Sequence, residues 1–375
     1  WDVAAHTELF RMTGHQAHDG FDGARGAWSP DGERIVSFSI DDGAVIWDGM
    51  TGARLIALSG HTDAVNHVRW SPDGTRIVTA SLDTTARVWD AATGETIAIL
   101  VGNSGMINRL DFSPDGTRVA TAGEDGMARV YDATTGRELF SFGERERSPF
   151  STADAKIEVL DVVWSGDGET LIASGTDGLA IFWDTRTGER RLTLRVPPTT
   201  DDLSGVNSNW INSVWWSLDE TRVLLHTPFT TPSLWDVRTG QPVFVMTGHN
   251  DVVVSARWSP DKARILTGGT DGTIRVWDAA TGDELMVMDH RATVYSAVWS
   301  PDGTQIASTA LNGTVRLWHA ATGEEVPFLG APALAVTAQV TNVSAQLDTD
   351  MNTAVSEIVA TMGVFMRSPT PTATP

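Results

Sequence analysis

The sequence predicts an all-β fold in which one four-stranded unit is repeated seven times. The first observation is a Trp-Asp pair, or a close variant of it, that recurs at fixed intervals: Trp1, Trp47, Trp89, Tyr131, Trp183, Trp235, Trp277 and Trp318. The intervals are 46, 42, 42, 52, 52, 42 and 41 residues, so most lie near one period. A constant period of this length indicates one supersecondary unit used repeatedly. The second observation is that two kinds of tight turn recur within each interval.

The second repeat shows the elements of the unit in order. A β-rich run at 64–70 is followed by Ser71-Pro-Asp-Gly74, and two further runs, 76–80 and 86–89, precede the turn Thr93-Gly94. In Ser-Pro-Asp-Gly, proline presets φ, aspartate caps the backbone and glycine accepts a positive φ, so the turn should close a hairpin. Four short strands with turn signals about every 8–12 residues are typical of one blade of a β-propeller.

Composition narrows the classes of function. The formal net charge of −21 argues against nucleic acid and anionic membranes as partners. No run of 18 or more apolar residues is present, so no membrane insertion is expected. The chain has no cysteine, which excludes disulfides, thiolate metal sites and cysteine nucleophiles. No phosphate-binding glycine loop, nucleophile elbow or paired-histidine helix appears, so we expect no cofactor, no metal and no catalytic residues.

The repeats resemble the WD-repeat β-propeller family over residues 1–330. The resemblance implies that each blade is held by a hydrogen-bonded tetrad of His, Ser or Thr, Asp and Trp, so the histidines are expected to be structural. The third blade has Thr121, Asp125 and Tyr131 with Asn103 in place of histidine. The first has Ser37, Asp41 and Trp47, the fourth keeps Asp177 and Trp183, and the fifth keeps Trp235. The fullest tetrads are His61, Thr79, Asp83 and Trp89; His249, Thr267, Asp271 and Trp277; and His290, Ser308, Asn312 and Trp318.

Three irregular segments interrupt the period. They are Gly143–Glu158, Arg195–Asn212 and His226–Pro232, and the resemblance implies that all three emerge on one face of the ring, the top face. Aromatic residues with arginine and proline on neighbouring loops are typical of protein-binding patches. The alternative interpretation is that these side chains fold the loops back onto the body. The residues that we expect in a protein-binding patch are Arg145, Arg147, Phe150, Pro198, Trp210 and Phe229.

The repeats contain one outer strand more than seven blades need. Thr7–Met12 precedes the first complete blade, and Glu324–Leu329 follows the seventh set of inner strands. We expect Thr7–Met12 to close the ring by pairing beside the strand at Val315–Trp318, because closure removes exposed sheet edges. The surplus strand then either lies loose or adds to a sheet edge of another molecule. An eighth blade upstream of Trp1 is the competing explanation.

A C-terminal arm, residues 331–367, follows the repeats, and a Pro/Thr-rich linker or tail occupies 368–375. Apolar residues between Leu334 and Met366 recur at about the helical period. The pattern predicts an amphipathic helical arm that either packs on its own propeller or docks on a neighbouring subunit, giving a homo-oligomer or a filament. Its buried stripe would contain Val336, Val340, Val343, Leu347, Val355, Ile358 and Phe365.

These observations favour a non-enzymatic protein–protein interaction or structural module. The interpretation that we develop is a bacterial surface or extracellular assembly subunit, a scaffold that self-associates through its C-terminal arm. One alternative is a ligand-sensing propeller domain of a larger intracellular signalling protein, which would be cytoplasmic. The other is a propeller enzyme with a site in the central channel, for which a bound metal or a carboxylate cluster would be the signature.

Overall fold

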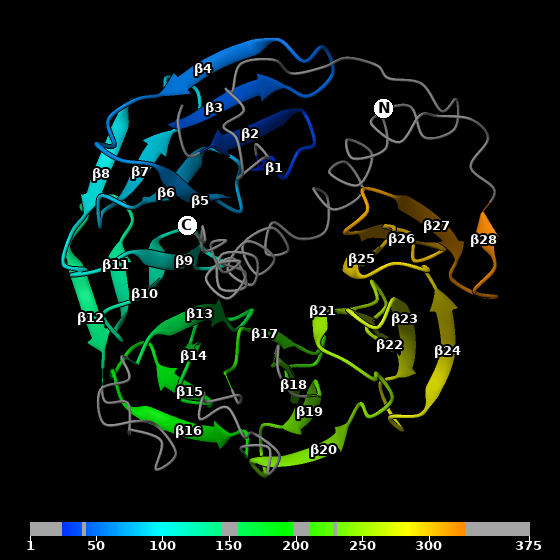
Figure 1. Cartoon of the computed structure of the whole chain (residues 1–375). Helices are drawn as coiled ribbons and strands as arrows, with labels where there is room; N and C mark the ends of the chain where they lie inside the picture. Colours follow the sequence, from blue (N-terminus) through cyan, green and yellow to red (C-terminus); the bar gives the residue numbers. More distant parts are fainter. Residues whose placement is uncertain (1–24, 40–42, 144–156, 198–209, 228–230, 327–375) are drawn as a thin grey trace, which may run out of the picture.

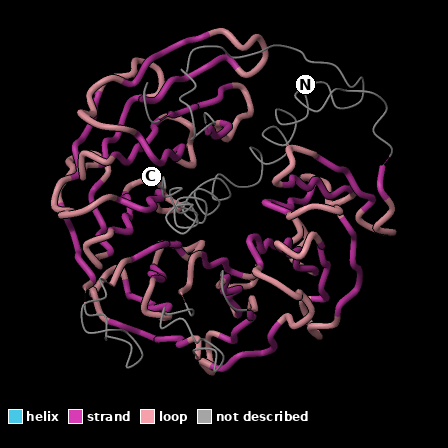
Figure 2. The backbone as a smooth tube through the Cα atoms, in the orientation of Figure 1, coloured by secondary structure: helices cyan, strands magenta, loops and turns pink. Residues whose placement is uncertain are grey.

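Seven four-stranded antiparallel sheets are arranged in a ring around a central axis in the computed structural model (Figure 1). The structure describes residues 25–39, 43–143, 157–197, 210–227 and 231–326. Within these ranges the elements are strands joined by turns and loops, and no helix occurs (Figure 2). The predicted all-β, seven-bladed propeller is therefore confirmed.

Each blade consists of four consecutive strands that pair in sequence order, with the first strand nearest the axis and the fourth on the rim. Blades 1 to 4 comprise β1 (Arg25–Trp28), β2 (Arg34–Ser39), β3 (Gly43–Asp48) and β4 (Arg54–Leu58); β5 (Val65–Trp70), β6 (Arg76–Ser81), β7 (Ala86–Asp90) and β8 (Thr96–Leu100); β9 (Ile107–Phe112), β10 (Arg118–Gly123), β11 (Ala128–Asp132) and β12 (Glu138–Phe142); and β13 (Val159–Trp164), β14 (Thr170–Gly175), β15 (Leu179–Asp184) and β16 (Arg190–Arg195). Blades 5 to 7 comprise β17 (Ser213–Trp216), β18 (Arg222–His226), β19 (Ser233–Asp236) and β20 (Gln241–Val245); β21 (Val253–Trp258), β22 (Arg264–Gly269), β23 (Thr273–Asp278) and β24 (Glu284–Asp289); and β25 (Val294–Trp299), β26 (Gln305–Ala310), β27 (Val315–His319) and β28 (Glu325–Val326).

The Ser-Pro-Asp-Gly sequences form the hairpins between the first and second strands. In blade 2 the Gly74 amide donates to the Ser71 carbonyl at 2.9 Å, and the Arg76 amide donates to the Ser71 hydroxyl at 2.9 Å. Gly74 has φ +67°, the left-handed conformation that glycine adopts without strain. The corresponding turns Ser217–Glu220 and Ser259–Lys262 keep this geometry without glycine, because Glu220 and Lys262 have φ of 54° and 57°. The turn is thus fixed by its serine and aspartate as well as by its glycine.

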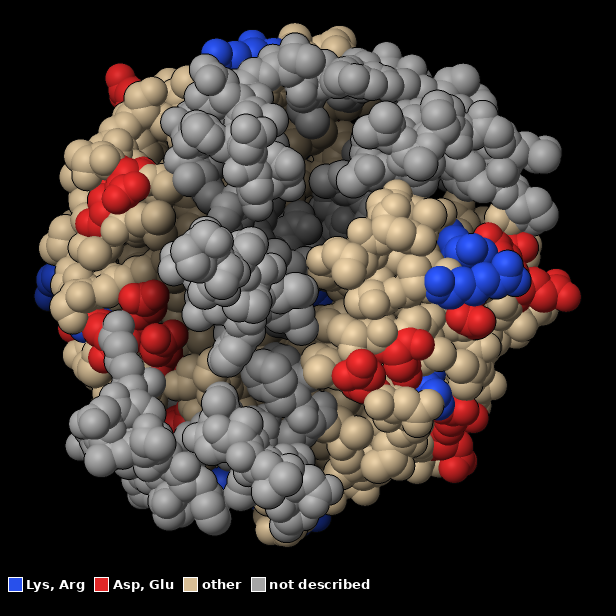
Figure 3. Space-filling view, in the orientation of Figure 1, with Lys and Arg blue, Asp and Glu red and all other residues tan. Residues whose placement is uncertain are grey.

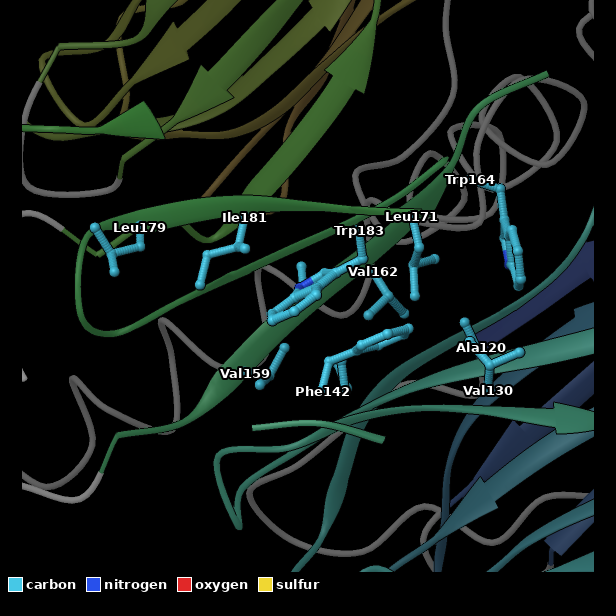
Figure 4. Close-up of a cluster of buried hydrophobic side chains, with 13 residues drawn as sticks. Ala120, Val130, Phe142, Val159, Val162, Trp164, Leu171, Leu179, Ile181 and Trp183 are labelled. Carbon is cyan, nitrogen blue, oxygen red and sulfur yellow. The ribbon is translucent and has the colours of Figure 1, made fainter. Parts of the chain in front are cut away.

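Six apolar cores, each shared by two consecutive blades, hold the ring together. Between blades 3 and 4 the cluster contains Val130 and Phe142 from one blade and Leu171 and Trp183 from the next (Figure 4). The Phe142 and Trp183 rings stack with their centroids 4.8 Å apart. Equivalent clusters join blades 1 and 2, 2 and 3, 4 and 5, 5 and 6, and 6 and 7. In blades 2 to 6, burial of both faces of the sheet therefore comes from the two neighbouring blades.

An arginine at the start of the second strand connects most blades to the next blade. Arg118 of blade 3 donates to the Gly168 carbonyl at 2.8 Å and to the Thr185 hydroxyl at 3.0 Å, and its guanidinium lies 4.8 Å from the centre of the Trp164 ring. Arg34, Arg76, Arg222 and Arg264 donate to carbonyls of the following blade in the same way. Lysine cannot make this forked, stacked contact, which explains why arginine occupies the position.

The seam between blades 7 and 1 differs from the other joins. Trp28, Ile35, Val45 and Trp47 form a cluster within blade 1, and Val298, Ala307 and Leu317 form another within blade 7. In the part of the chain that the structure describes, no shared core joins these two blades. The arginine position of blade 7 is occupied by Gln305. Six of the seven joins therefore share an apolar core and five of these also have the arginine contact, since Thr170 takes that position in blade 4, whereas the seam has neither among the described residues.

The predicted closure of the ring by Thr7–Met12 is wrong. The strand beside β27 is β28, which pairs Val326 with Leu317 and Glu325 with Trp318. It follows β27 through a tight turn in which the Gly323 amide donates to the His319 carbonyl at 2.8 Å. A short hairpin costs less loop-closure entropy than joining the two ends of the chain, so the local strand occupies the edge. Thr7–Met12 lies outside the described residues.

Candidate interaction site

Blades 2 and 6 contain continuous hydrogen-bonded chains that lead from tryptophan to aspartate. In blade 2, Trp89 Nε1 donates to the Thr79 hydroxyl at 2.8 Å, and that hydroxyl lies 2.7 Å from His61 Nε2. His61 Nδ1 lies 2.9 Å from Asp83 Oδ2. This pattern assigns the proton of a neutral imidazole to Nδ1, facing the carboxylate. Blade 6 repeats the chain with Trp277, Thr267, His249 and Asp271 at distances of 2.8 to 3.1 Å.

The electrostatics of the hydrogen-bonded chain in blade 2 favour a structural role for His61 and Asp83. Burial lowers the pKa of His61, although the hydrogen bond with Asp83 opposes the effect. Burial raises the pKa of Asp83, but hydrogen bonds from the Thr85 hydroxyl and the Thr62 amide, together with His61, outweigh it and hold the pKa well below its usual range. The pair therefore consists of a neutral histidine and a charged carboxylate, both already engaged, which leaves no free base for catalysis.

Blade 7 has a rearranged version of the chain. His290 Nδ1 faces the Ser308 hydroxyl at 2.8 Å, and Nε2 faces the Thr314 hydroxyl at 2.9 Å. Asn312 accepts from that Thr314 hydroxyl at 2.6 Å, so the predicted fourth member reaches the histidine only through threonine. Burial and the nearby Arg316 charge lower the pKa of His290 to about 4. The imidazole is turned over relative to His61, and the sequence alone could not assign its orientation.

The degenerate blades use other partners. In blade 3, Asn103 donates to the Tyr131 hydroxyl at 3.4 Å, and Arg129 links Asn103 to the Asp125 carboxylate. Burial raises the pKa of Tyr131 to about 12. In blade 5 the tryptophan Trp235 donates to Ser233 two residues away on the same strand. In blade 1, Trp47 donates to Ser37 at 2.6 Å, while Asp41 lies outside the described residues.

A belt of buried and half-buried polar side chains joins the innermost strands of blades 2 to 5, and sequence reasoning missed it. Asn66 and Asn108 donate to the carbonyls of Ile107 and Val159, each in the following blade, at 2.8 Å. Asp161 accepts from the Val214 amide of blade 5 at 3.0 Å. The sequence did carry a signal for these side chains. Each lies three or four positions before the tryptophan or phenylalanine that ends its strand.

One ion pair of this belt is almost completely buried. Arg109 Nε lies 3.7 Å from Asp161 Oδ1, with side-chain exposures of 3% and 4%. Burial raises the pKa of Asp161, and the Arg109 charge opposes this effect. His226 Nε2 donates to the Val253 carbonyl at 3.0 Å, and burial lowers the pKa of His226 to about 4. Within the described ranges no group of three or more His, Cys, Asp or Glu residues has the geometry of a metal site.

The stems of the two long insertions meet at one turn of blade 4. The Thr176 amide donates to the Glu158 carbonyl at 3.1 Å, and the Glu158 amide donates to the Thr176 hydroxyl at 2.9 Å. At the same turn the Val196 amide donates to Gly178 and the Ile211 amide donates to Gly175. These contacts bring together the end of the first insertion and both ends of the second.

The stem of the third irregular segment lies beside them. The Asn212 amide donates to the His226 carbonyl at 2.9 Å, which joins the second insertion to the segment that begins at His226. Trp210 is partly buried next to this contact. The other residues expected in the patch, Arg145, Arg147, Phe150, Pro198 and Phe229, lie outside the described residues. The seven residues of the predicted assembly arm, Val336 to Phe365, also lie outside them.

Charge is distributed unevenly over the face in Figure 3. Acidic side chains gather in several separate clusters around the ring, whereas lysine and arginine appear in few places. This agrees with the formal net charge of −21 for the whole chain. Among the described residues no helix is long and apolar enough to cross a membrane.

Comparison with known proteins identifies the repeats. A family model described as "WD domain, G-beta repeat" matches residues 52–90, 94–132, 149–184, 240–278 and 282–319, together about half of the chain. The crystal structure of the computationally designed Ika8 protein is similar, with a TM-score of 0.65 and 25% sequence identity over 83% of this chain and 88% of that one. No curated protein matches the chain. The internal unmatched stretch 185–239 contains the first three strands of blade 5, which keeps only the tryptophan of the predicted tetrad.

Proposed function

The chain belongs to the WD40-repeat family, and from this premise we propose that it is a non-enzymatic module that binds a protein partner through its top face. WD40 propellers are in general interaction or scaffold modules. The binding surface consists of the three irregular segments Gly143–Glu158, Arg195–Asn212 and His226–Pro232. The tetrads and the inner polar belt maintain the fold that presents these segments.

The convergence of the loop stems carries this proposal. Glu158, Val196 and Ile211 all contact the turn Gly175–Gly178, and Asn212 contacts His226. Segments that are far apart in sequence therefore leave the propeller at one place on blades 4 and 5. Specificity in a repeat scaffold resides in such loops, because the strands are needed for the fold. The aromatic and arginine residues in these loops supply the anchors typical of protein-binding surfaces.

Substitution of Trp210 and Phe229 by alanine tests the proposal. We expect the double variant to lose specific partners from an extract of the source organism, identified by quantitative mass spectrometry, while its thermal melt stays close to that of the parent. Leu218→Ala is the matched control, because Leu218 is 77% exposed and occupies the β17–β18 turn on the opposite side of blade 5. Equal recovery of all proteins by the three chains would refute the proposal, as would unfolding of the Trp210 variant.

We further propose that the protein is an assembly subunit at a bacterial surface or in the extracellular space. The apolar stripe from Val336 to Phe365 would dock on a neighbouring copy and form oligomers or filaments, because a heterologous contact need not close. Deletion of residues 331–375 should then reduce the mass measured in solution by light scattering. An unchanged mass would refute docking by the arm. Localisation of the full-length protein in fractionated cells distinguishes a surface subunit from a cytoplasmic sensor.

A further inference from the structure

The outermost strand of each blade presents one edge to the surroundings. In blade 2 this strand is β8, on the rim of the ring, and it pairs with β7 alone among the described strands (Figure 1). Its side chains alternate, with Ala98 and Leu100 buried against the next blade. Ile97, Ile99 and Val101 point outward and are 37%, 44% and 59% exposed. An open edge with a row of exposed aliphatic side chains is a site at which another strand can pair.

β8 is the least protected outer strand that the structure describes. Natural sheets protect an open edge with charged residues or proline, which hinder pairing with a second molecule. β8 has the sequence Thr-Ile-Ala-Ile-Leu, without charge, proline or glycine. Every other described outer strand has at least one protecting residue: Arg54 in β4, Glu138 in β12, Arg190, Arg191 and Arg195 in β16, Pro242 in β20, Glu284 and Asp289 in β24, and Glu325 in β28.

We propose that β8 is a self-association edge that pairs in antiparallel orientation with β8 of a second copy. A two-fold axis at Ile99, the centre of the exposed row, places Ile99 opposite its own symmetry mate. Ile97 of one copy then lies opposite Val101 of the other, twice. All three cross-strand pairs on this face are aliphatic, which is the favourable combination. The two blades form one continuous eight-stranded sheet, and the same patch serves both copies, as a two-fold contact requires.

A second copy fits this edge better than a charged partner does. The row Ile97, Ile99 and Val101 contains no charge that would select a complementary sequence, and it is complementary to itself. Two chains of net charge −21 repel each other over most of their surfaces, so they approach best along a neutral strip. The β8 edge lies outside the three irregular segments, and the proposed contact does not depend on the functions proposed for those segments or for the C-terminal arm.

Size and charge determine how strong the association should be. Pairing of one short strand buries less than the roughly 1,200–2,000 Å² of a standard stable interface. The dimer should therefore be weak, with a dissociation constant in the micromolar range or higher. Salt should strengthen it, because a Debye length that falls to about 8 Å at physiological ionic strength screens the repulsion between the two acidic bodies. Stabilisation by salt distinguishes this contact from an interface built on ion pairs.

Sedimentation of the full chain over a range of concentrations tests the proposal, with Ile99→Lys as the main variant. The substitution places two like charges directly opposite each other on the axis and should weaken dimerisation at least about tenfold. Because Ile99 is exposed, the fold should be unaffected, and the thermal melt verifies this. Val287→Lys is the matched control, since Val287 has the same position in β24 and is 46% exposed. It should associate as the parent does.

The register has its own test. Ile97→Lys and Val101→Glu should each weaken the dimer, and the chain that carries both should regain association, because the introduced lysine of each copy faces the introduced glutamate of the other. Hydrogen exchange at residues 96–101 should slow as concentration rises. A parent chain that stays monomeric, an equal loss with Val287→Lys, or exchange independent of concentration would overturn the proposal. Failure of the double substitution to restore association would overturn the register centred on Ile99.

Discussion

Removal of one hydroxyl group from the tetrad of blade 2 should destabilise the whole propeller. Thr79→Val keeps the shape of the side chain and deletes the oxygen that lies 2.8 Å from Trp89 Nε1 and 2.7 Å from His61 Nε2. Thr79 is fully buried and Trp89 is 1% exposed, so water cannot easily replace the hydroxyl. Each buried polar group left without a partner costs about 1–3 kcal/mol, which gives about 2–6 kcal/mol for the two groups.

Urea denaturation followed by tryptophan fluorescence measures this change in the free energy of unfolding. For a propeller of this size the loss should lower the melting temperature by roughly 3–10 °C. Thr309→Val is the control, because Thr309 lies in the second strand of blade 7 and has no tetrad role. Thr267→Val should reproduce the loss in blade 6, where the same chain occurs. A Thr79 variant as stable as the Thr309 variant would show that the tetrad does not stabilise the blade.

Three further predictions concern other buried contacts. Asp161→Asn removes the carboxylate facing the buried Arg109 and should cost about 3–5 kcal/mol in urea denaturation, whereas Asp251→Asn at an exposed position should cost little. Arg118→Lys loses the forked contact to blade 4 and the stacking on Trp164, so we expect a loss of about 1–2 kcal/mol that the exposed control Arg137→Lys does not show. His290 has a pKa of about 4 when folded but about 6.5 when unfolded, so between these values the unfolded chain binds more protons and stability falls as pH falls. His290→Gln should reduce this fall in a pH series of denaturation curves, and an unchanged pH dependence would contradict the assignment.

The sequence by itself predicted the repeat and most of its local geometry. The 42-residue period, the Ser-Pro-Asp-Gly turns and the alternation within the strands each express a local requirement, such as a positive φ at Gly74. The tetrad positions came from the resemblance to the WD-repeat family, carried over to the matching residues of each blade. The predicted site was less accessible, since of its six top-face residues only Trp210 lies within the described residues.

Only the tertiary structure decided how distant segments meet. It placed β28 rather than Thr7–Met12 beside β27, because a hairpin between neighbouring strands closes more easily than the two ends of the chain. It also paired Arg109 with Asp161 and gathered the stems at Glu158, Val196 and Ile211 on one turn. These residues are adjacent because successive blades stand side by side around the axis. A linear pattern specifies each blade, whereas the contacts between blades depend on the curvature of the assembled ring.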